Sequence, residues 1–130
     1  MITEDYVPYK VARLLQEKGF NEVCFACYEY FISGVTMYSG WQFEYKGESV
    51  RNTDERVKCP TLQMTMKWLR DVHNLHITVK PYNSPNGIVY HYEIYKLGKV
   101  TTSLLKEKSG FENNESACKD AITYSLMNLI

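Results

Sequence analysis

The hydrophobic and polar positions change their period once within residues 59–79, CPTLQMTMKWLRDVHNLHITV. Pro60 and Thr61 open a segment in which Leu62, Met66, Leu69 and His73 recur three and four residues apart on one face, which is the period of an amphipathic helix. Over residues 75–80, apolar and polar residues alternate strictly, which is the period of a half-buried strand. This stretch therefore predicts a helix that leads directly into a strand.

Two further helices are predicted near the ends of the chain. Residues 4–18 carry apolar positions at helical spacing, with Thr3 as the N-cap and Gly19 at the C-terminal cap. Beyond Asn113 or Asn114, either of which can cap a helix, apolar residues again recur at helical spacing to the end of the chain.

The remaining segments predict strands and loops. Residues 23–45 are rich in aromatic and β-branched residues and contain two Ser-Gly pairs, so we expect two or three short strands there that form a hairpin or meander. Residues 46–58 are polar, and we expect a mobile loop or a protruding hairpin. Residues 88–95, IVYHYEIY, predict a strand, whereas residues 96–112 predict a loop that includes a short strand near Val100.

Residues 83–87, NSPNG, predict the turn of a hairpin between the two alternating strands. A plain five-residue loop would place polar Lys80 among the apolar residues of the opposite strand. A shift of one residue through a bulge instead pairs Lys80 with His91 and Thr78 with Glu93, and it unites both apolar faces. We therefore expect the shifted register.

The predicted elements follow the order α-β-β-α-β-β-α, with hairpins in place of crossover connections. This order is typical of an α+β fold, in which an antiparallel sheet of about four to five strands has three helices packed mainly on one face. The length of 130 residues predicts a single domain over residues 1–130.

Charge and composition narrow the classes of function. Fifteen basic and fifteen acidic residues cancel, and no run of Lys or Arg is present, which disfavours nucleic-acid binding through the phosphate backbone. Eleven tyrosines leave one alternative open, the stacking of aromatic side chains on single-stranded bases. No apolar run is long enough to span a bilayer, and the N-terminus lacks a signal-peptide pattern. We expect a cytoplasmic protein without a membrane partner, whose four cysteines stay reduced.

Cys24 and Cys27 have the spacing of half a zinc site, and His73 and His76 offer two further ligands. Residues three apart on a strand point to opposite faces, and the two histidines span the predicted end of a helix. We therefore favour buried structural cysteines, and we expect no metal and no cofactor.

In the shifted register, five polar or aromatic residues share the outer face of the hairpin: His76, Lys80, His91, Glu93 and Tyr95. Histidine beside glutamate supplies groups for general acid–base chemistry, which makes this a candidate ligand face. The favoured alternative is a hydrated sheet face with cross-strand ion pairs. The sequence contains no phosphate-binding loop or nucleophile motif, and no catalytic residue is predicted.

Met64 and Trp68 lie four residues apart, beyond the main apolar face of the central helix, and Lys67 and Asp71 border them. An apolar patch with a polar rim is typical of a partner surface, and a two-fold homodimer would cover it. The alternative is a second internal contact, and the sequence leaves both open.

Three segments carry a family resemblance: ITEDYVPYKVARLLQEKGF, CPTLQMTMKWLRDVHNLHI and ESACKDAITYSLMNLI. Through them the chain resembles small uncharacterised proteins of Bacteroides and related gut bacteria, which are often associated with phages, prophages or other mobile elements. The resemblance covers most of the chain outside residues 46–58 and 96–112, and its motifs are packing motifs. It implies a cytoplasmic accessory protein of a bacterial or phage genome, and it implies no functional residues.

Three functions follow in order of preference. The first is a non-enzymatic interaction module that associates with itself as a homodimer. The second is a small ligand-binding or enzymatic domain that uses His76, His91 and Glu93. The third is a protein that binds single-stranded nucleic acid by aromatic stacking.

Overall fold

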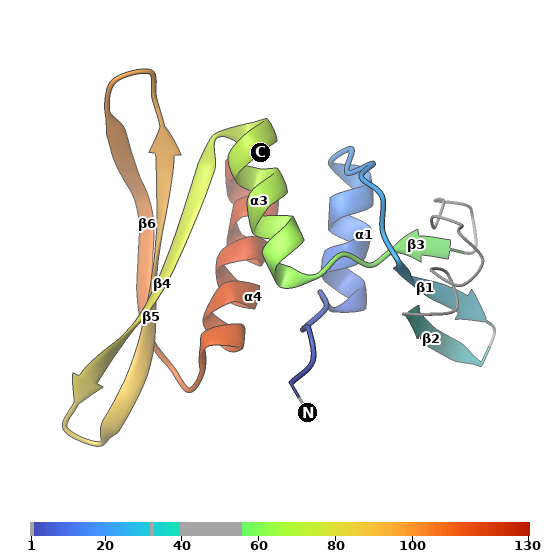
Figure 1. Ribbon diagram of the computed structural model, residues 1–130, viewed down its shortest axis with the longest axis horizontal. Helices are drawn as coiled ribbons and strands as arrows, with labels where there is room; N and C mark the ends of the chain where they lie inside the picture. Colours follow the sequence, from blue (N-terminus) through green and yellow to red (C-terminus); the bar gives the residue numbers. More distant parts are fainter. Residues whose placement is uncertain (1, 32, 40–55) are drawn as a thin grey trace. The chain divides into compact units, whose positions relative to one another are not determined.

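The computed structural model describes residues 2–31, 33–39 and 56–130 (Figure 1). The chain divides into two compact units, Met1–Thr61 and Leu62–Ile130, and each is described by itself. The described residues form three α-helices and two antiparallel sheets of three strands each. The predicted α+β class is confirmed, but one sheet of four to five strands was expected. The single domain stays a prediction.

The helix of the first unit, α1, spans Tyr9–Glu17 and begins later than predicted. Pro8 precedes it in an extended conformation, and a residue that precedes proline is also biased toward extended backbone. The segment before Pro8 therefore pairs instead of coiling: Tyr6 bridges Thr61, and the Val7 amide donates to the Pro60 carbonyl at 3.1 Å. Thr3 is consequently not the N-cap.

The C-terminal end of α1 is confirmed at Gly19. Its φ of 88° is a left-handed conformation that costs glycine little. The Phe20 amide donates to the Leu15 carbonyl at 2.9 Å, and the Gly19 amide donates to the Gln16 carbonyl at 3.2 Å. These two bonds form a Schellman motif, which satisfies carbonyls that the helix end would otherwise leave unpaired.

The sheet of the first unit has the strand order β2-β1-β3. Its strands are β1 (Ala26–Phe31), β2 (Gly34–Ser39) and β3 (Arg56–Lys58). The expected hairpin in residues 23–45 is confirmed as far as Ser39, while residues 40–55, and with them most of the predicted loop 46–58, lie outside the described residues. The loop prediction is wrong at β3, because Val57 and Lys58 are buried there and pair with β1.

The second unit opens with α3 (Leu62–His73), as the apolar spacing predicted. Asn74, with φ 57°, takes the left-handed conformation that ends the helix. The chain enters β4 (Leu75–Ser84) at the next residue.

The hairpin of β4 with β5 (Gly87–Leu97) has the predicted register: Lys80 lies opposite His91, and Thr78 lies opposite Glu93. The predicted cause is wrong, because the strands extend to Ser84 and Gly87 and a two-residue turn joins them. Gly87 has φ 123°, and the Ser84 hydroxyl donates to the Gly87 carbonyl at 2.8 Å. A short turn therefore sets the register that we had assigned to a bulge.

The third strand of this sheet, β6 (Thr102–Phe111), occupies the segment that was predicted as a loop. It pairs with β5 through two irregularities, where Leu105 and Gly110 are the extra residues. Gly110 has φ 94°, as the glycine of a bulge often does. These bulges interrupt the alternation, which is why the pattern did not predict a ten-residue strand.

The last helix, α4 (Asn114–Tyr124), continues into a π-helical turn, η1 (Ser125–Leu129). Asn113 is its N-cap, as one of the two predicted alternatives, and its side chain accepts from the Ser116 amide at 2.8 Å. Within this unit, α3 and α4 both lie on one face of the β4-β5-β6 sheet, and the opposite face carries no helix (Figure 1). The core between helices and sheet includes Leu69, Leu75, Tyr92, Ile94, Ile122 and Leu126.

One buried hydrogen bond ties this sheet to α4. Tyr92 is fully buried, and its hydroxyl donates to an Asp120 carboxylate oxygen at 2.9 Å. Lys108, on the neighbouring strand, lies 3.9 Å from the same oxygen. Asp120 therefore provides the buried Tyr92 hydroxyl with a charged acceptor at the edge of the core.

We predict that Tyr92→Phe lowers the free energy of unfolding by about 1–2 kcal/mol, because it removes a hydrogen bond to a charged group and preserves the ring. Urea denaturation followed by circular dichroism measures the loss. The matched control is Tyr82→Phe on the exposed side of the sheet, which we expect to change stability by less than about 0.5 kcal/mol. Equal losses from both variants would contradict the role of the Asp120 bond.

Candidate functional site

The candidate site lies on the face of the β4-β5-β6 sheet that α3 and α4 leave uncovered, here called the outer face. Alternation along the strands points even-numbered residues of β4 and odd-numbered residues of β5 to this side. The opposite positions of β5, Tyr92 and Ile94, are fully buried. The outer face therefore follows directly from burial of the inner one.

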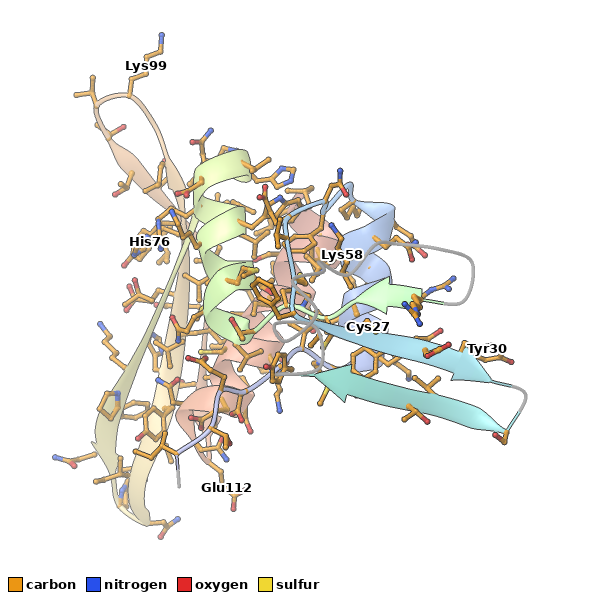
Figure 2. The ribbon with its side chains drawn as sticks, turned by 45° about the vertical axis from the view of Figure 1, so that its right-hand side comes forward. Cys27, Tyr30, Lys58, His76, Lys99 and Glu112 are labelled. Carbon is orange, nitrogen blue, oxygen red and sulfur yellow. The ribbon has the colours of Figure 1, made fainter. Side chains whose placement is uncertain are left out.

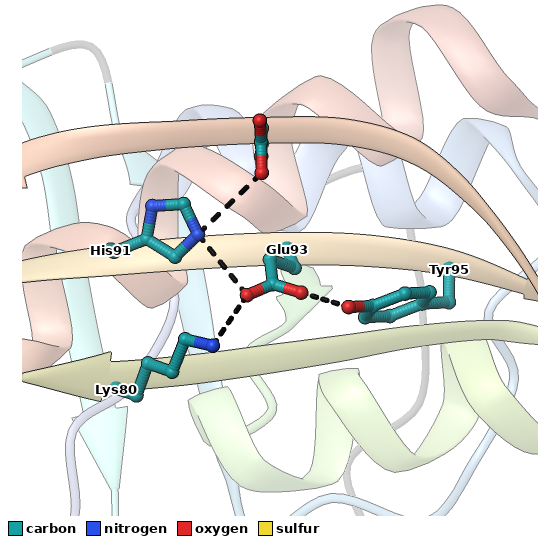
Figure 3. Close-up of polar contacts among 5 residues, drawn as sticks. Lys80, His91, Glu93 and Tyr95 are labelled. Carbon is teal, nitrogen blue, oxygen red and sulfur yellow. Dashed lines mark hydrogen bonds and ion pairs between the residues drawn. The ribbon is translucent and has the colours of Figure 1, made fainter.

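Glu93 is the centre of the outer face, and three side chains hold its carboxylate (Figure 3). Oε1 lies 2.7 Å from Lys80 Nζ and 3.2 Å from His91 Nε2, and Oε2 accepts a hydrogen bond from the Tyr95 hydroxyl. The Glu93 side chain is only 12% exposed. The hydrogen bond from Lys80 is the largest cause that holds the pKa of Glu93 below its ordinary value, and His91 acts in the same direction. The carboxylate therefore stays charged and fully engaged.

Glu107, on β6, is a member of this cluster that the sequence did not reveal. It lies directly opposite Glu93 in the β5–β6 ladder, which places two like charges in a cross-strand pair. Its Oε2 lies 3.9 Å from His91 Nε2, and its side chain is 60% exposed. Because residues 96–112 were predicted as a loop, Glu107 was not assigned to the outer face. The sequence did contain one sign of a strand: Lys106 and Lys108 lie two positions apart with Glu107 between them, so in a strand Glu107 faces the side opposite to both lysines.

The chemistry that this cluster supports is ion pairing. A general acid must hold a proton, and the lowered pKa of Glu93 leaves it deprotonated. A general base must face its substrate, but both oxygens of Glu93 already accept from neighbours. The structure thus favours the hydrated, ion-paired face over a catalytic one.

The fifth predicted residue of the face, His76, lies beside the cluster. It is opposite Tyr95 in the ladder, two cross-strand pairs beyond Thr78 and Glu93, which is the next pair on the same face. It is half-buried on the sheet, where Figure 2 labels it. The structure brings together Lys80, His91, Glu93 and Tyr95, and it places His76 at their margin.

Met64 and Trp68 occupy the predicted positions on α3, but the indole is only 6% exposed. The Trp68 ring meets the His73 ring edge to face, with 4.7 Å between centroids. Met64 is half-buried. These positions favour the alternative of an internal contact over that of an exposed patch.

The four cysteines are free thiols, and all of them are buried. Burial raises the pKa of Cys24 to about 11 and that of Cys59 to about 12, and it also raises the pKa of Cys27. A thiol must lose its proton to bind a metal or attack a disulfide. Cys24 and Cys27 therefore have the environment of structural cysteines; Figure 2 labels Cys27 on β1.

The two histidines of the HxxH segment separate onto different elements. His73 ends α3 and packs on Trp68, whereas His76 lies on β4. Among residues 2–31, 33–39 and 56–130, no group of three or more His, Cys, Asp or Glu side chains is arranged to hold a metal ion. In the same ranges, no helix has both the length and the apolar character needed to cross a membrane.

Comparison of the chain with models of protein families, with curated proteins and with solved structures found no match.

We predict that the native protein does not react with a disulfide reagent such as DTNB at pH 8, because all four thiols are buried and burial raises the pKa of Cys24, Cys27 and Cys59. Full denaturation should release four equivalents of thiol, the number of cysteines in the chain. A Cys118→Ala variant calibrates the assay, because it should release one equivalent fewer on denaturation. Fast labelling of native Cys24 or Cys27, located by mass spectrometry, would contradict the structural role.

We predict that His73 makes the fold less stable in mild acid. Burial is the main cause that lowers the pKa of His73, and its Nε2 is buried without a hydrogen-bond partner. The unfolded chain therefore binds a proton near pH 6.5 while the folded chain does not, so stability falls as the pH drops through about 6.5. The fall ends once the pH passes the lower pKa of the folded state.

Urea denaturation at pH 7.5 and pH 5 measures this loss, and His73→Gln should reduce the difference between the two pH values. An NMR titration of the ring provides the matching observation, a midpoint below 6.5 for His73. An unchanged pH dependence in the variant would contradict the prediction.

Proposed function

We propose that the chain is a non-enzymatic interaction module that associates with itself through the outer face. One observation carries the proposal: within the second unit, α3 and α4 cover one side of the β4-β5-β6 sheet, and no helix of that unit covers the other side (Figure 1). Large apolar side chains remain exposed toward both ends of the open side, with Tyr82 41% and Leu104 49% exposed. Sheets with one face free of helices are common, but exposed aliphatic and aromatic side chains on that face favour a contact surface.

The polar centre supports binding in preference to catalysis. Lys80, His91 and Tyr95 all direct their polar atoms at Glu93, and this carboxylate remains charged. The second candidate function, ligand binding or catalysis by His76, His91 and Glu93, would require these groups to face a substrate. Their mutual satisfaction favours the interaction module.

The edges of the sheet support the face as the contact surface. β4 and β6 are the two edge strands. Pro81 lacks an amide donor on β4, and β6 carries Lys106, Lys108 and two bulges. These features protect an edge from pairing with another strand. A partner therefore finds the face more accessible than either edge.

The proposed setting is an accessory role in the cytoplasm of a bacterium or in a phage genome. The resemblance of the chain supports it, as do the four buried free thiols. The third candidate, single-stranded nucleic-acid binding, has less support, because Tyr92 serves the core and the outer face has a single lysine, Lys80, on its three strands.

We predict that sedimentation velocity from about 10 to about 500 µM reveals a dimer that dissociates on dilution, as expected for a small interface. Leu104→Glu should yield a folded monomer, because it places a charge in the contact surface. Val100→Glu is the matched control: Val100 is 93% exposed between β5 and β6, outside the paired strands. A monomer at every concentration, or equal effects of the two variants, would contradict the proposal. Salt-sensitive binding of single-stranded oligonucleotides would instead favour the third candidate.

A further inference from the structure

The turn end of the β5–β6 hairpin, residues 96–106, is both basic and apolar; we call it the hairpin end. Its sequence, KLGKVTTSLLK, contains three lysines and no acidic residue, in a chain whose fifteen basic and fifteen acidic residues cancel. Large apolar side chains are exposed in the same segment: Val100 is 93% exposed and Leu105 is 41% exposed. Positive charge and exposed apolar surface therefore occur together at this end of the sheet.

A tight turn presents two of these side chains. Beyond the last pair of the ladder, the Gly98 amide donates to the Thr101 carbonyl at 2.9 Å. A Cβ atom on Gly98 would lie 2.7 Å from the Thr101 oxygen, so this close approach requires glycine. Lys99 and Val100 consequently occupy the tip of the hairpin, and the Lys99 side chain points away from the strands (Figure 2).

The three lysines of the hairpin end have no anionic partner within the part of the chain that the structure describes. Lys96 donates to the His73 carbonyl at 3.0 Å, and Lys106 lies over the Tyr124 ring at 4.9 Å, so both contacts are with uncharged groups. No described carboxylate forms an ion pair with either of them or with Lys99. The hairpin end therefore presents three positive charges that are not neutralised.

The acidic residues of the same two strands lie elsewhere on the sheet. Glu93 and Glu107 oppose each other at the centre of the outer face. Four residues of β5 separate Glu93 from Leu97, where the ladder ends, and this is about 13 Å at the rise of a strand. The Debye length is about 8 Å at physiological ionic strength, so these carboxylates are screened from the tip. Within the second unit, the hairpin end also extends beyond α3 and α4 (Figures 1 and 2).

We infer that the hairpin end docks on an anionic lipid surface. Val100 enters the headgroup region, and Lys96, Lys99 and Lys106 lie near the lipid phosphates. Elements that bind at a membrane surface combine apolar side chains with lysines in this way, since the apolar groups are buried while the cations attract acidic lipids. The inference goes beyond the proposed function, because the contact uses the tip of the hairpin instead of the outer face.

The side chains at the tip favour lipid over nucleic acid, which also presents phosphates. The phosphate backbone offers no apolar environment for Val100, whereas a bilayer does. The hairpin end also contains no arginine and no aromatic residue, and proteins that bind single strands use such residues to stack on bases.

The inference differs from the sequence-based expectation of no membrane partner. That expectation depended on the lack of an apolar run long enough to span a bilayer. A peripheral contact requires no such run, because it reaches only the headgroup region.

Flotation of the chain with lipid vesicles tests the inference. We expect binding to vesicles of phosphatidylglycerol and phosphatidylcholine in equal parts, and binding at least about tenfold weaker to phosphatidylcholine alone. Lys99→Gln should weaken binding about fivefold, which corresponds to about 1 kcal/mol for one lysine near an anionic surface. Val100→Ser should weaken binding about tenfold, because full burial of a valine side chain contributes about 1.5 kcal/mol.

Lys67→Gln is the matched control. It removes the same charge from an exposed lysine of α3 that pairs with Asp71, so vesicle binding should stay unchanged. All three substitutions are at exposed positions, and circular dichroism verifies that each variant folds. Absence of binding at low salt, equal binding to the two kinds of vesicle, or equal effects of Lys67→Gln and Lys99→Gln would overturn the inference.

One further outcome would assign the hairpin end to a different partner. Binding of a single-stranded oligonucleotide that depends on Lys99 but not on Val100, without binding to vesicles, would indicate nucleic acid and overturn the lipid contact. The dimer is measured in the absence of lipid, so each of these results leaves the proposed function unaffected.

Discussion

The alternation of side chains along β5 is the constraint on which the second unit depends. β5 pairs with β4 on one edge and β6 on the other, so each of its residues has a fixed side in both ladders. Tyr92 and Ile94 are fully buried, while Glu93 between them faces outward. A slip of one residue would bring Glu93 toward the core, and an unpaired buried carboxylate costs several kcal/mol. The candidate site thus lies on the face of the sheet that is opposite to the hydrophobic core.

Sequence pattern predicted those elements whose two faces differ in polarity. α3, β4 and β5 have such faces, and their type and hairpin register were correct. β6 has polar residues on both faces, because Lys106 and Lys108 extend along the inner side to Tyr124 and Asp120. Its two bulges disrupt the remaining period. The start of α1 was misplaced because the pairing of Tyr6 with Thr61 joins residues far apart in the sequence.

The residues of the candidate site were predicted or missed for the same reason. The hairpin register predicted that Lys80, His91, Glu93 and Tyr95 would share a face, and the structure confirms it. Glu107 could not be predicted as part of the cluster, because it joins the cluster only through β6. For Trp68 the pattern was ambiguous in principle: a wide apolar arc on a helix looks the same whether it packs internally or awaits a partner. Only the three-dimensional packing shows that Trp68 is buried.

The Glu93–Glu107 pair is the place where a local rule is broken. Opposite charges stabilise neighbouring positions on a sheet, whereas like charges cost up to about 1 kcal/mol, and β6 has lysines one residue away on either side. The alternation of β6 sends those lysines to α4, where they meet Tyr124 and Asp120, so the strand leaves its negative residue outward. Because both lysines are engaged on the inner side, the exposed Glu107 carboxylate has no lysine of β6 beside it on the outer face. Such local inconsistencies are expected where a surface serves a function beyond the stability of the single chain.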